Sequence, residues 1–422
     1  MTQSRYRRAV TVVHSLTSWL EQTQTWMFSQ LASLPADIRC HIVCESTQNL
    51  DQFYLPNIHS LDRASKLRIA WDRSLRKLGV REHLQFLSQQ ARRNSADILH
   101  SHFGPMAWAN IEVAKQLRLK HVVTFYGYDV NHVPRSDPRW YPRYAELFEH
   151  IDLVLCEGPH MAKCIVALGC PDSKVKVHHL GVLLDRVVFQ PRTWSAGEPL
   201  RVLIAASFRE KKGIPYAIEA LAQIQHEVRL EITIVGDASR ESVQDQEEKQ
   251  KILGLIAKHE LQGKVKLLGF QPHAELLEQA YRHHIYLSPS VTAGSGDTEG
   301  GAPVSLIEMA ATGMLIVSTV HCDIPEVVQD GVSGLLAKER DVDGLAARLR
   351  WLAQNPEAWP RMLGAGRKHV ETHFDAVIQA QGQAATYRAM LEPASDLPPR
   401  TSLHSARPSL RTRADATEVD RY

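Results

Sequence analysis

Short apolar runs that alternate with helical patterns constrain this chain more than any other feature of its sequence. Runs rich in Val, Ile and Leu are typical of strands in a parallel sheet that helices cover on both faces. Two series of runs predict an α/β protein with two doubly wound, Rossmann-like domains. The first series lies at residues 9–15, 39–45, 97–103, 121–127, 152–158 and 174–181. The second series lies at residues 201–207, 230–236, 265–270, 285–290, 314–319 and 333–338.

The boundary between the predicted domains falls at residues 189–199, where Pro, Gly and Ser interrupt both periodicities. We expect an N-terminal domain over residues 1–192 and a C-terminal domain over 193–375. A helix over 376–392 is expected to pack back toward the first domain. The Pro-, Ser- and Arg-rich segment 393–422 is expected to form a disordered tail, because it has few large apolar residues to bury. Residues 23–34 and 106–119 are typical helical segments between strands, and Met106 and Trp108 are expected to be core residues.

Charge is balanced over the whole chain but not within each half. The 49 Lys and Arg against 47 Asp and Glu give a net charge of +2, which offers no reason to expect a nucleic-acid partner. Residues 1–193 hold 24 basic and 17 acidic residues, whereas residues 194–392 hold 20 and 26. Much of the basic excess lies in residues 62–93, a predicted helical pair. This stretch could dock on an anionic membrane surface, although a solvated basic helix face is the interpretation that the sequence alone favours.

Other features of the sequence bear on the compartment and on metals. No apolar run approaches the ~20 residues that span a bilayer, so we expect a cytoplasmic protein that is at most peripheral on the cytoplasmic membrane face. The six cysteines form neither a CxxC motif nor a Cys/His metal pattern. Reduced thiols and no metal site are therefore expected.

The segment 288–303 has the composition of a phosphate-binding loop. A strand ends at Pro289, a Gly-rich loop follows, and Pro303 opens a helix that holds Glu308. Glycines let backbone N–H groups approach a ligand, and a helix N-terminus carries partial positive charge. Glu308, one turn into the helix, is placed to accept hydrogen bonds from two ribose hydroxyls.

A second candidate element is the turn after the strand 201–207. Arg209, Lys211 and Lys212 lie in it, and Gly213 closes it. In a doubly wound sheet this turn lies at the ligand-binding edge. Its cations could neutralise a diphosphate leaving group without a metal. For this turn alone, a solvated basic surface would be the better interpretation.

Together, residues 207–221 and 288–337 resemble the C-terminal domain of the family 4 retaining glycosyltransferases. That family has the GT-B fold, in which two Rossmann-like domains face each other across a cleft. The family has a Glu, seven residues and a second Glu in this region, and EGGAPVSLIE, residues 299–308, resembles that pattern. The segments 96–105, 121–130 and 169–182 resemble the exopolysaccharide-assembling, colanic-acid-type branch. The resemblance covers residues 10–375.

The resemblance implies a nucleoside-diphosphate sugar as donor, a UDP- or GDP-sugar, and a glycan or lipid-linked oligosaccharide as acceptor. It implies transfer with retention and without a cofactor or metal. Arg209 and Lys212 would stabilise the departing nucleotide, Glu299 would contact the donor sugar, and Glu308 would bind the ribose. The implied donor contacts, largely through backbone groups, are Gly300, Gly301, Ala302, Pro303 and Val304, with Gly236 and Phe270 near the base. The implied acceptor-binding residues are His102, Tyr126 and Asp129.

The chain departs from the family pattern at three positions. Glu299 precedes Glu308 by nine positions, so that Gly300 occupies the place of the first family glutamate. Either the loop bulges to place Glu299, or backbone groups replace its carboxylate. Ser207 stands where the family has an arginine for the phosphate, with Arg209 as its expected substitute. Tyr126 stands where the family often has a histidine.

Three other functions compete with sugar transfer. A nicotinamide-dependent oxidoreductase is disfavoured, because the first strand is followed by LTSWLEQT rather than GxGxxG. A nucleotide-sugar epimerase of the same fold would need no acceptor. A degenerate, non-catalytic nucleotide-sugar-binding protein would explain the three departures, but the retained Arg209, Lys212 and Glu308 argue against it.

Overall fold

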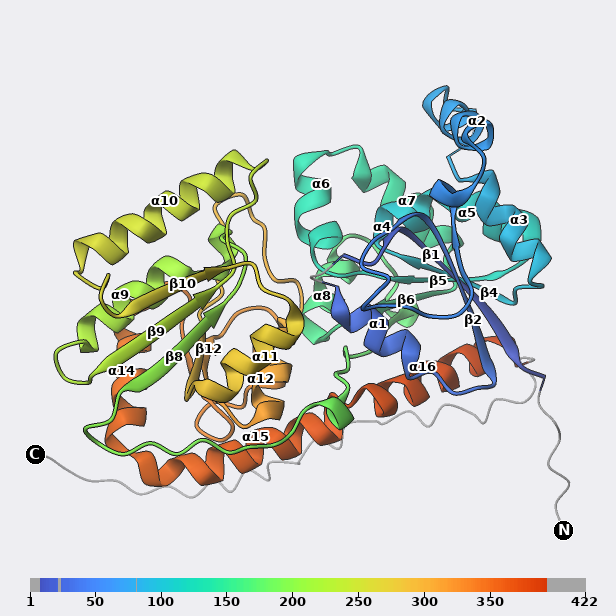
Figure 1. Cartoon of the computed structure of the whole chain (residues 1–422). Helices are drawn as coiled ribbons and strands as arrows, with labels where there is room; N and C mark the ends of the chain where they lie inside the picture. The colour runs from blue at the N-terminus through green and yellow to red at the C-terminus, as the bar shows by residue number, and fades with distance from the viewer. Residues whose placement is uncertain (1–7, 22–23, 81, 393–422) are drawn as a thin grey trace, which may run out of the picture.

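The computed structural model describes residues 8–21, 24–80 and 82–392 of the 422-residue chain. The predicted tail, residues 393–422, lies outside the described residues. The described chain forms two α/β units that lie side by side, each built around a parallel sheet (Figure 1). Both predicted doubly wound domains are therefore present, and the predicted fold class is confirmed.

The first unit contains a seven-stranded sheet in the order β3-β2-β1-β4-β5-β6-β7. All six predicted strands form, and β3 is a short edge strand that the sequence did not reveal. The strands are β1 (Val10–Trp19), β2 (Ile38–Thr47), β3 (Ile58–Ser60), β4 (Ile98–His102), β5 (Lys120–Thr124), β6 (Leu153–Cys156) and β7 (Val175–Val177). Its helices are α1 (Thr25–Ala32), α2 (Lys66–Lys77), α3 (Gln85–Arg93), α4 (Gly104–Ala109), α5 (Ile111–Leu117), α6 (Val133–Ser136), α7 (Trp140–His150) and α8 (Pro159–Ala167).

The second unit contains a six-stranded sheet in the order β10-β9-β8-β11-β12-β13. The strands are β8 (Leu200–Ala205), β9 (Leu230–Val235), β10 (Val265–Gly269), β11 (Ile285–Ser288), β12 (Leu315–Thr319) and β13 (Leu335–Ala337). The helices are α9 (Ile214–Ile224), α10 (Val243–Lys258), α11 (His273–Arg282), α12 (Val304–Thr312), α13 (Ile324–Val327), α14 (Val342–Gln354), α15 (Trp359–His373) and α16 (Ala376–Leu391). Short helical turns lie at Leu61–Arg63, Tyr128–His132, Asp172–Lys174, Leu184–Arg186, Glu210–Lys212 and Pro356–Ala358.

The strand order reverses once in each sheet, between β1 and β4 and between β8 and β11. Loops that leave the carboxyl ends of strands on either side of such a reversal diverge, and ligands bind in the crevice between them. The turn after β8 and the Gly-rich loop after β11 flank the reversal in the second sheet. The topology therefore brings together the two elements that the sequence singled out.

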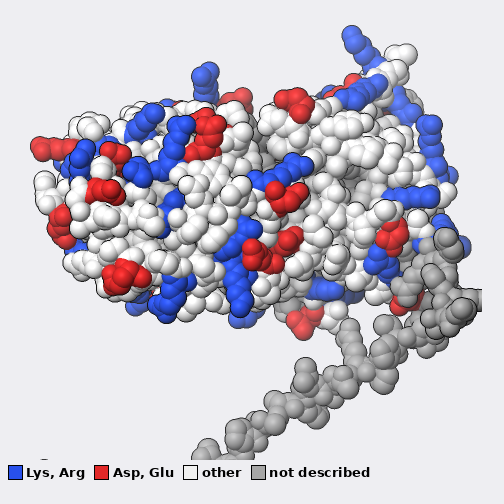
Figure 2. Space-filling model, turned by 60° about the horizontal axis from the view of Figure 1, so that its bottom comes forward, with Lys and Arg blue, Asp and Glu red and all other residues white. Residues whose placement is uncertain are grey.

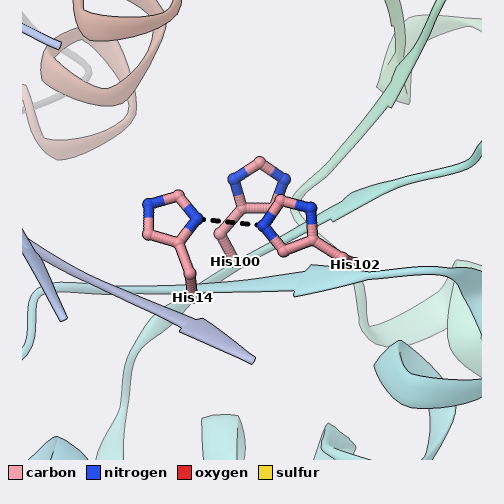
Figure 3. Close-up of side chains that lie close together, drawn as sticks. All are labelled: His14, His100 and His102. Atoms are coloured by element: carbon pink, nitrogen blue, oxygen red, sulfur yellow. Dashed lines mark hydrogen bonds between the residues drawn. The ribbon is translucent and has the colours of Figure 1, made fainter. Parts of the chain in front are cut away.

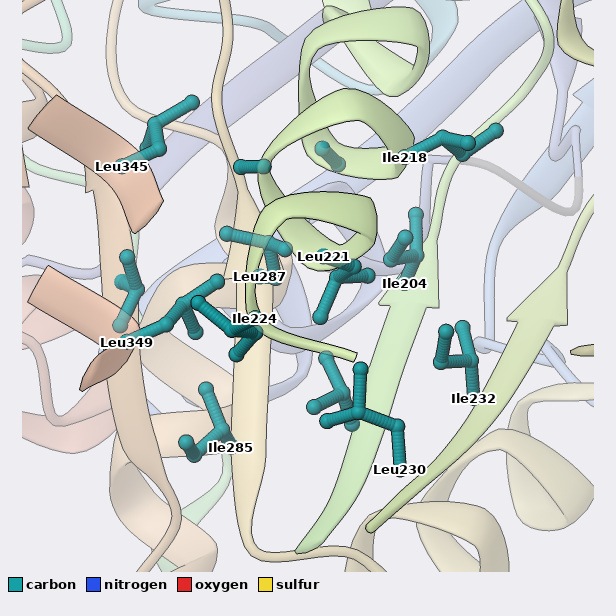
Figure 4. Packing of buried hydrophobic residues seen from close by; sticks show 14 of the residues in the cluster. Ile204, Ile218, Leu221, Ile224, Leu230, Ile232, Ile285, Leu287, Leu345 and Leu349 are labelled. Atoms are coloured by element: carbon teal, nitrogen blue, oxygen red, sulfur yellow. The ribbon is translucent and has the colours of Figure 1, made fainter. Parts of the chain in front are cut away.

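Aliphatic side chains from both faces of the second sheet anchor its strands. One cluster packs α9 and α14 against β8, β9 and β11 (Figure 4). Ile204, Leu221, Ile285 and Leu349 are each at most 2% exposed. Burial of that extent contributes roughly 1.5–3 kcal/mol for each side chain. The strands that carry the site are therefore held by a packed core.

Two segments connect the units. Buried Arg192, in the linker before β8, donates hydrogen bonds to the backbone oxygens of Ala280, His283 and Thr312. At the other end of the second unit, α15 continues into α16, which runs back beneath the first unit (Figure 1). Helix α16 is held there by the ion pair between Arg388 and Asp37.

Candidate active site

A cavity of about 450 Å³ lies between the two units at the carboxyl ends of their strands. From the second unit it is lined by the ends of β8, β9 and β10 and by the loop before α12. From the first unit, Trp26, Phe103, Tyr126, Glu157 and Leu180 line it. Of the predicted site residues, the cavity brings together Arg209, Lys212, Gly236, Phe270, Glu299, Ala302, Pro303, Val304, Glu308 and Tyr126. Gly300, Gly301, His102 and Asp129 lie outside its lining.

The basic turn after β8 is paired with acidic residues of the loop after β11. The Arg209 guanidinium lies 2.7 Å from the Asp297 carboxylate. Lys211 is buried and donates to the Thr298 carbonyl oxygen at 2.8 Å, so it ties the loop to the turn. Lys212 lies at the cavity, with its ammonium nitrogen 2.7 Å from Oε2 of Glu299. Asp297 is a partner that the sequence pattern did not reveal.

The Glu299 carboxylate lies in the cavity despite its departure from the family spacing. Its second oxygen, Oε1, accepts a hydrogen bond from the Ser290 hydroxyl at 2.7 Å. Burial on its own would raise the pKa of Glu299, but Lys212 and Lys211 outweigh it and lower the pKa to about 2. The group is therefore a fixed carboxylate. The loop thus places the Glu299 carboxylate in the cavity lining, bound to Lys212 and Ser290.

Gly300 and Gly301 carry the loop against the first unit. A Cβ atom on Gly300 would lie 2.2 Å from the Cα atom of Gly127, and one on Gly301 would lie 2.0 Å from Oε2 of Glu157. Gly300 also has φ of +79°, a conformation that other L residues rarely adopt. Close approach to the opposite unit is therefore what these two glycines permit here.

Glu308 lies on α12, one turn from the N-terminus of that helix. One of its carboxylate oxygens is 2.9 Å from Nε2 of His273, which lines the same cavity from α11. The hydrogen bond to Glu308 raises the pKa of His273, more than burial lowers it. This histidine is a partner that the sequence motif did not indicate.

Phe270 adds an exposed aromatic side chain to the cavity lining. The Phe270 side chain follows β10, is 57% exposed and lines the cavity. The Gly236 N–H is bonded to the Gly269 carbonyl oxygen at 2.7 Å, which holds the ends of β9 and β10 together. An exposed aromatic face beside backbone atoms suits stacking of a nucleobase.

On the opposite wall, Tyr126 turns its hydroxyl away from the cavity. Its oxygen is 2.7 Å from Nδ1 of His102, and its ring packs on Trp26 with centroids 4.3 Å apart. Burial raises the pKa of the Tyr126 phenol well above its usual range. Buried Asp129 accepts hydrogen bonds from the N–H groups of Gly104 and Tyr126, so it shapes the turn after β5. Tyr126 therefore lines the cavity while its hydroxyl is engaged with His102.

Three histidines form a buried cluster behind Tyr126 (Figure 3). Potential ligand atoms of His14, His100 and His102 lie within 4.8 Å of one another, a spacing that a metal ion could bridge. Their ring nitrogens are bonded to protein groups. Nδ1 of His14 lies 3.0 Å from Nε2 of His102, and His100 contacts Tyr387 and Thr124 at 2.6 and 2.7 Å. Burial lowers the pKa of each histidine, which favours neutral rings held by these hydrogen bonds.

Glu157 is a cavity residue that the sequence analysis missed. It follows β6 and lines the cavity from the first unit. Its carboxyl group makes no hydrogen bond or ion pair within the described residues. Burial raises the pKa of Glu157 well above its usual range, and the carboxylates of Asp323, Asp129 and Glu299 raise it further. Its position directly after a buried strand, on the ligand edge of the sheet, is the signal that could have found it.

Two doubly wound sheets that face each other across a cleft are the architecture of the GT-B fold, which is the fold of one large class of glycosyltransferases. Comparison with known proteins agrees. Residues 26–186 match the family model "Glycosyltransferase Family 4", and residues 189–369 match "Glycosyl transferases group 1". The chain is 35% identical over 289 residues to the amylovoran biosynthesis glycosyltransferase AmsK of Erwinia amylovora. This match covers 67% of this chain and 68% of that protein.

Further relatives point the same way. The chain is 32% identical over 301 residues to the Escherichia coli protein named "Putative colanic acid biosynthesis glycosyltransferase WcaL", and the match covers 70% of this chain and 71% of that protein. Its fold matches the crystal structure of Anabaena HepE in complex with UDP, with a TM-score of 0.70 at 16% identity, over 90% of this chain and 100% of that one. The chain therefore belongs to the glycosyltransferase family that these models and relatives share.

Proposed function

We propose that this protein transfers a sugar from a UDP- or GDP-sugar to a glycan or lipid-linked acceptor, with retention at the anomeric carbon and without a metal or cofactor. The observation that carries the proposal is the convergence of Arg209, Lys212, Glu308 and the N-terminus of α12 on one cavity. Two cations and a helix N-terminus suit a diphosphate, and a carboxylate nearby suits the hydroxyls of a ribose. HepE, a structure of the same fold, was solved with UDP.

In this proposal the donor lies along the second unit. Phe270 stacks on the base, and Glu308 accepts hydrogen bonds from the ribose hydroxyls. The diphosphate lies between the basic turn and the N-terminus of α12, where Arg209 and Lys212 supply the positive charge that a departing nucleoside diphosphate needs. That charge makes a metal ion unnecessary for the leaving group.

Retention is proposed to follow a front-face course, in which the departing phosphate accepts the proton of the acceptor hydroxyl. The carboxylates around the cavity support this course over a covalent one. Glu299 is bound to Lys212 and Ser290, Glu308 is bound to His273, and burial favours a neutral Glu157. A nucleophilic carboxylate would need to be ionised and free to attack.

Thermal unfolding with a panel of nucleotide sugars tests the donor assignment. We expect UDP- or GDP-sugars to raise Tm, with NAD and NADP as negative controls. Glu308→Ala should abolish the shift, because it removes the ribose acceptor, whereas Glu278→Ala, on the exposed face of α11, should keep it. A chain that no nucleoside diphosphate stabilises would contradict the proposal. The anomeric configuration of the product, measured by NMR with and without EDTA, tests retention and metal independence.

We also propose that residues 62–93 bind the anionic cytoplasmic surface of a membrane. Helix α2 projects from the first unit (Figure 1), and it exposes Leu67 and Trp71 at 85% and 62%. Figure 2 shows Lys and Arg side chains gathered along the end of the molecule to which α2 belongs. Exposed apolar residues beside cations suit an interface of headgroups and acyl chains. Within the described residues, no helix combines the length and apolar character needed to cross a bilayer.

A further inference from the structure

Two polar side chains of the second unit lie behind the Gly-rich loop and contact it from the side away from the cavity lining. His321 follows β12 and is 2% exposed, and Glu339 follows β13. Nδ1 of His321 lies 2.7 Å from Oε1 of Glu339. Nε2 of the same ring lies 3.1 Å from the backbone nitrogen of Glu299. One imidazole ring therefore connects a carboxylate to the residue that pairs with Lys212 in the cavity.

The hydrogen-bond partners of His321 define which ring nitrogen carries its proton. A backbone N–H can only donate, so Nε2 accepts from Glu299 and Nδ1 donates to the Glu339 carboxylate. The Cys322 thiol lies 3.2 Å from Nε2. Burial raises the pKa of this thiol to about 12, so the thiol keeps its proton and is also suited to donate to that nitrogen. A neutral ring with its proton on Nδ1 satisfies all three contacts.

Glu339 is suited to orient this ring because other contacts fix its carboxylate. Its Oε2 atom accepts the N–H of Thr292 at 2.7 Å, and its Oε1 atom accepts the hydroxyl of Thr292 at 3.4 Å. Burial on its own would raise the pKa of Glu339, but the hydrogen bonds from Thr292 and His321 outweigh burial and lower the pKa. Glu339 and His321 therefore hold the two ends of the loop segment 292–299.

The backbone position of Glu299 matters because its carboxylate belongs to the charge arrangement in the cavity. One carboxylate oxygen lies 2.7 Å from the Lys212 ammonium nitrogen, and the other accepts the Ser290 hydroxyl. Glu299 precedes Glu308 by nine positions, one more than in the family pattern, so the loop holds an additional residue. The hydrogen bond to His321 fixes the loop at the residue that this additional length would otherwise leave free to shift.

We infer that His321 and Glu339 are positioning residues for the donor site. Glu339 orients the neutral ring, and the ring holds the backbone of Glu299. In that place the Glu299 carboxylate keeps Lys212 where a leaving diphosphate needs positive charge. Neither side chain of the pair is among the described residues that line the cavity, so both act through Glu299. The inference rests on the proposed transfer function and adds to it two residues that govern turnover more than nucleotide binding.

The protonation state of the His321 ring can be measured without any substrate. NMR spectroscopy of protein labelled with ¹⁵N at histidine distinguishes a ring protonated on Nδ1 from a ring protonated on Nε2 or on both nitrogens. The signals of His321 are those that disappear from the spectrum of His321→Gln. We expect the Nδ1–H form at neutral pH, because Nε2 accepts from the Glu299 N–H. A His321 ring that carries a proton on Nε2 overturns the inference.

Release of the nucleoside diphosphate from the donor, with water as the acceptor, measures the effect on turnover. The donor is the UDP- or GDP-sugar that raises Tm most. His321→Phe keeps a buried ring but removes both hydrogen bonds. We expect kcat to fall by about 10²-fold, the cost of a small displacement of catalytic groups, while the Kd for UDP or GDP rises less than about threefold.

Two further variants separate the hydrogen bonds from the ring itself. In His321→Gln the amide oxygen takes the place of Nε2 and accepts from the Glu299 N–H, so this variant should recover at least about tenfold of the kcat that His321→Phe loses. In Glu339→Gln one acceptor oxygen replaces two, so the side chain cannot accept from both His321 and Thr292. We expect that variant to lose about tenfold in kcat.

His283→Phe is the matched control. His283 is 5% exposed, and its ring nitrogens lie 2.6 Å from the Gln279 carbonyl oxygen and 2.8 Å from the Thr233 hydroxyl. It precedes β11, whereas His321 follows β12, so it belongs to the end of the parallel sheet away from the site. This variant also loses two buried hydrogen bonds and should keep its kcat. Circular dichroism and Tm establish which variants fold.

The outcomes distinguish this inference from the proposed function. If the natural protein binds UDP or GDP and releases it from a donor, while His321→Phe keeps its kcat or loses equal factors in kcat and affinity, the inference is overturned and the proposed function stands. An equal loss of kcat in His283→Phe also overturns it, because any loosening of the unit would then suffice. If no nucleotide binds the natural protein, the proposed function itself fails. Should His321→Phe not fold, Glu339→Gln and the tautomer of the natural protein decide in its place.

Discussion

At the scale of the residue, the candidate site is a set of charges that hold one another in place. Lys212 and Glu299 form a nearly buried ion pair, with side-chain exposures of 21% and 5%. Such a pair fixes the ammonium group in the cavity before any ligand arrives, so no reorganisation is needed when charge develops on a leaving group. We therefore expect Lys212 to matter more for turnover than for donor binding.

Replacement of Lys212 by Ala tests this role. We expect kcat to fall by about 10²–10³, the cost of removing one preorganised donor to a developing anion. The dissociation constant for the donor should rise by no more than about tenfold. Steady-state kinetics together with calorimetric titration of the nucleoside diphosphate measure both quantities. Equal losses in kcat and in donor affinity would mean that Lys212 binds only the ground state.

Glu157 gives a second prediction at this scale, because its pKa is raised in the folded protein. Between the ordinary pKa of a glutamate and the raised value, the unfolded chain loses its proton while the folded chain keeps it. The free energy of unfolding therefore falls as the pH rises through this window, by up to about 1.4 kcal/mol for each pH unit. Glu157→Gln places a neutral side chain of the same shape at this position, so the free energy of unfolding should no longer fall with pH on account of residue 157.

Urea unfolding of both proteins between pH 5 and pH 8 measures the effect. The stability of Glu157→Gln should fall less steeply with pH than that of the natural protein, and the two curves should converge toward acidic pH. Parallel curves would show that Glu157 is ionised in the folded state. Glu278→Gln, with a side chain that is 60% exposed, is the control.

At the scale of the element, strands were easier to predict than the contacts between their loops. The twelve predicted runs all form strands. They could be found because a strand of a covered parallel sheet is buried on both faces and therefore reads as a continuous apolar run. The edge strand β3 has three residues and lacks that signal. Residues 106–119 form two helices rather than one. They meet at Asn110, whose side chain donates to the hydroxyls of Ser15 and Ser101.

The same contrast holds for the candidate site. The motif 299–308 and the basic turn could be located in the sequence, since each is local. The partners of these residues could not: Asp297 binds Arg209 across 88 positions, and His273 binds Glu308 across 35. Such pairs depend on how close the strand order brings two loops, and no local pattern encodes that distance.

The proposed membrane binding by helix α2 can be tested with substitutions on that helix. Leu67→Gln combined with Trp71→Gln should remove binding to vesicles that contain phosphatidylglycerol, because both side chains lie on the exposed face of the helix. Stability should not change, since neither residue is buried. Arg73→Gln combined with Lys77→Gln should weaken binding mainly at low salt, where the attraction to anionic lipid is least screened.

Flotation of the protein with vesicles at two salt concentrations measures both effects. Val243→Gln is the control, because Val243 is 67% exposed on a helix of the second unit. The membrane proposal fails if the natural protein does not float with anionic vesicles at low salt, or if the α2 variants float as well as it does.

At the scale of the whole molecule, the two units meet through the loops that form the cavity. The Asp323 carboxylate, from the second unit, accepts hydrogen bonds from the N–H groups of His160 and Met161 at the N-terminus of α8. Asn131 donates to the Thr298 hydroxyl at 2.8 Å. The Gly-rich loop is therefore fastened to both units, and the distance between the units sets the shape of the site.

Gly300 lies at the tightest point of this contact, so its replacement by Ala tests whether transfer needs the units to meet. Gly300 and Gly331 both have positive φ, +79° and +74°, so Ala costs about 1–2 kcal/mol of backbone strain at either position. At Gly331 an added Cβ meets no atom within 4 Å, whereas at Gly300 it would lie 2.2 Å from the Cα atom of Gly127. The backbone strain should therefore cost similar stability in the two variants, while only Gly300→Ala also forces the units apart.

We expect Gly300→Ala to lower kcat/KM by about tenfold or more, because it displaces Glu299 and the loop amides from the donor. Small-angle scattering should show a larger radius of gyration than for Gly331→Ala, whose activity should stay near that of the natural protein. Donor binding by the second unit should persist in both variants, since the contacts of Glu308 and Phe270 are independent of the first unit. Equal activity of the two variants would mean that transfer does not require this contact between the units.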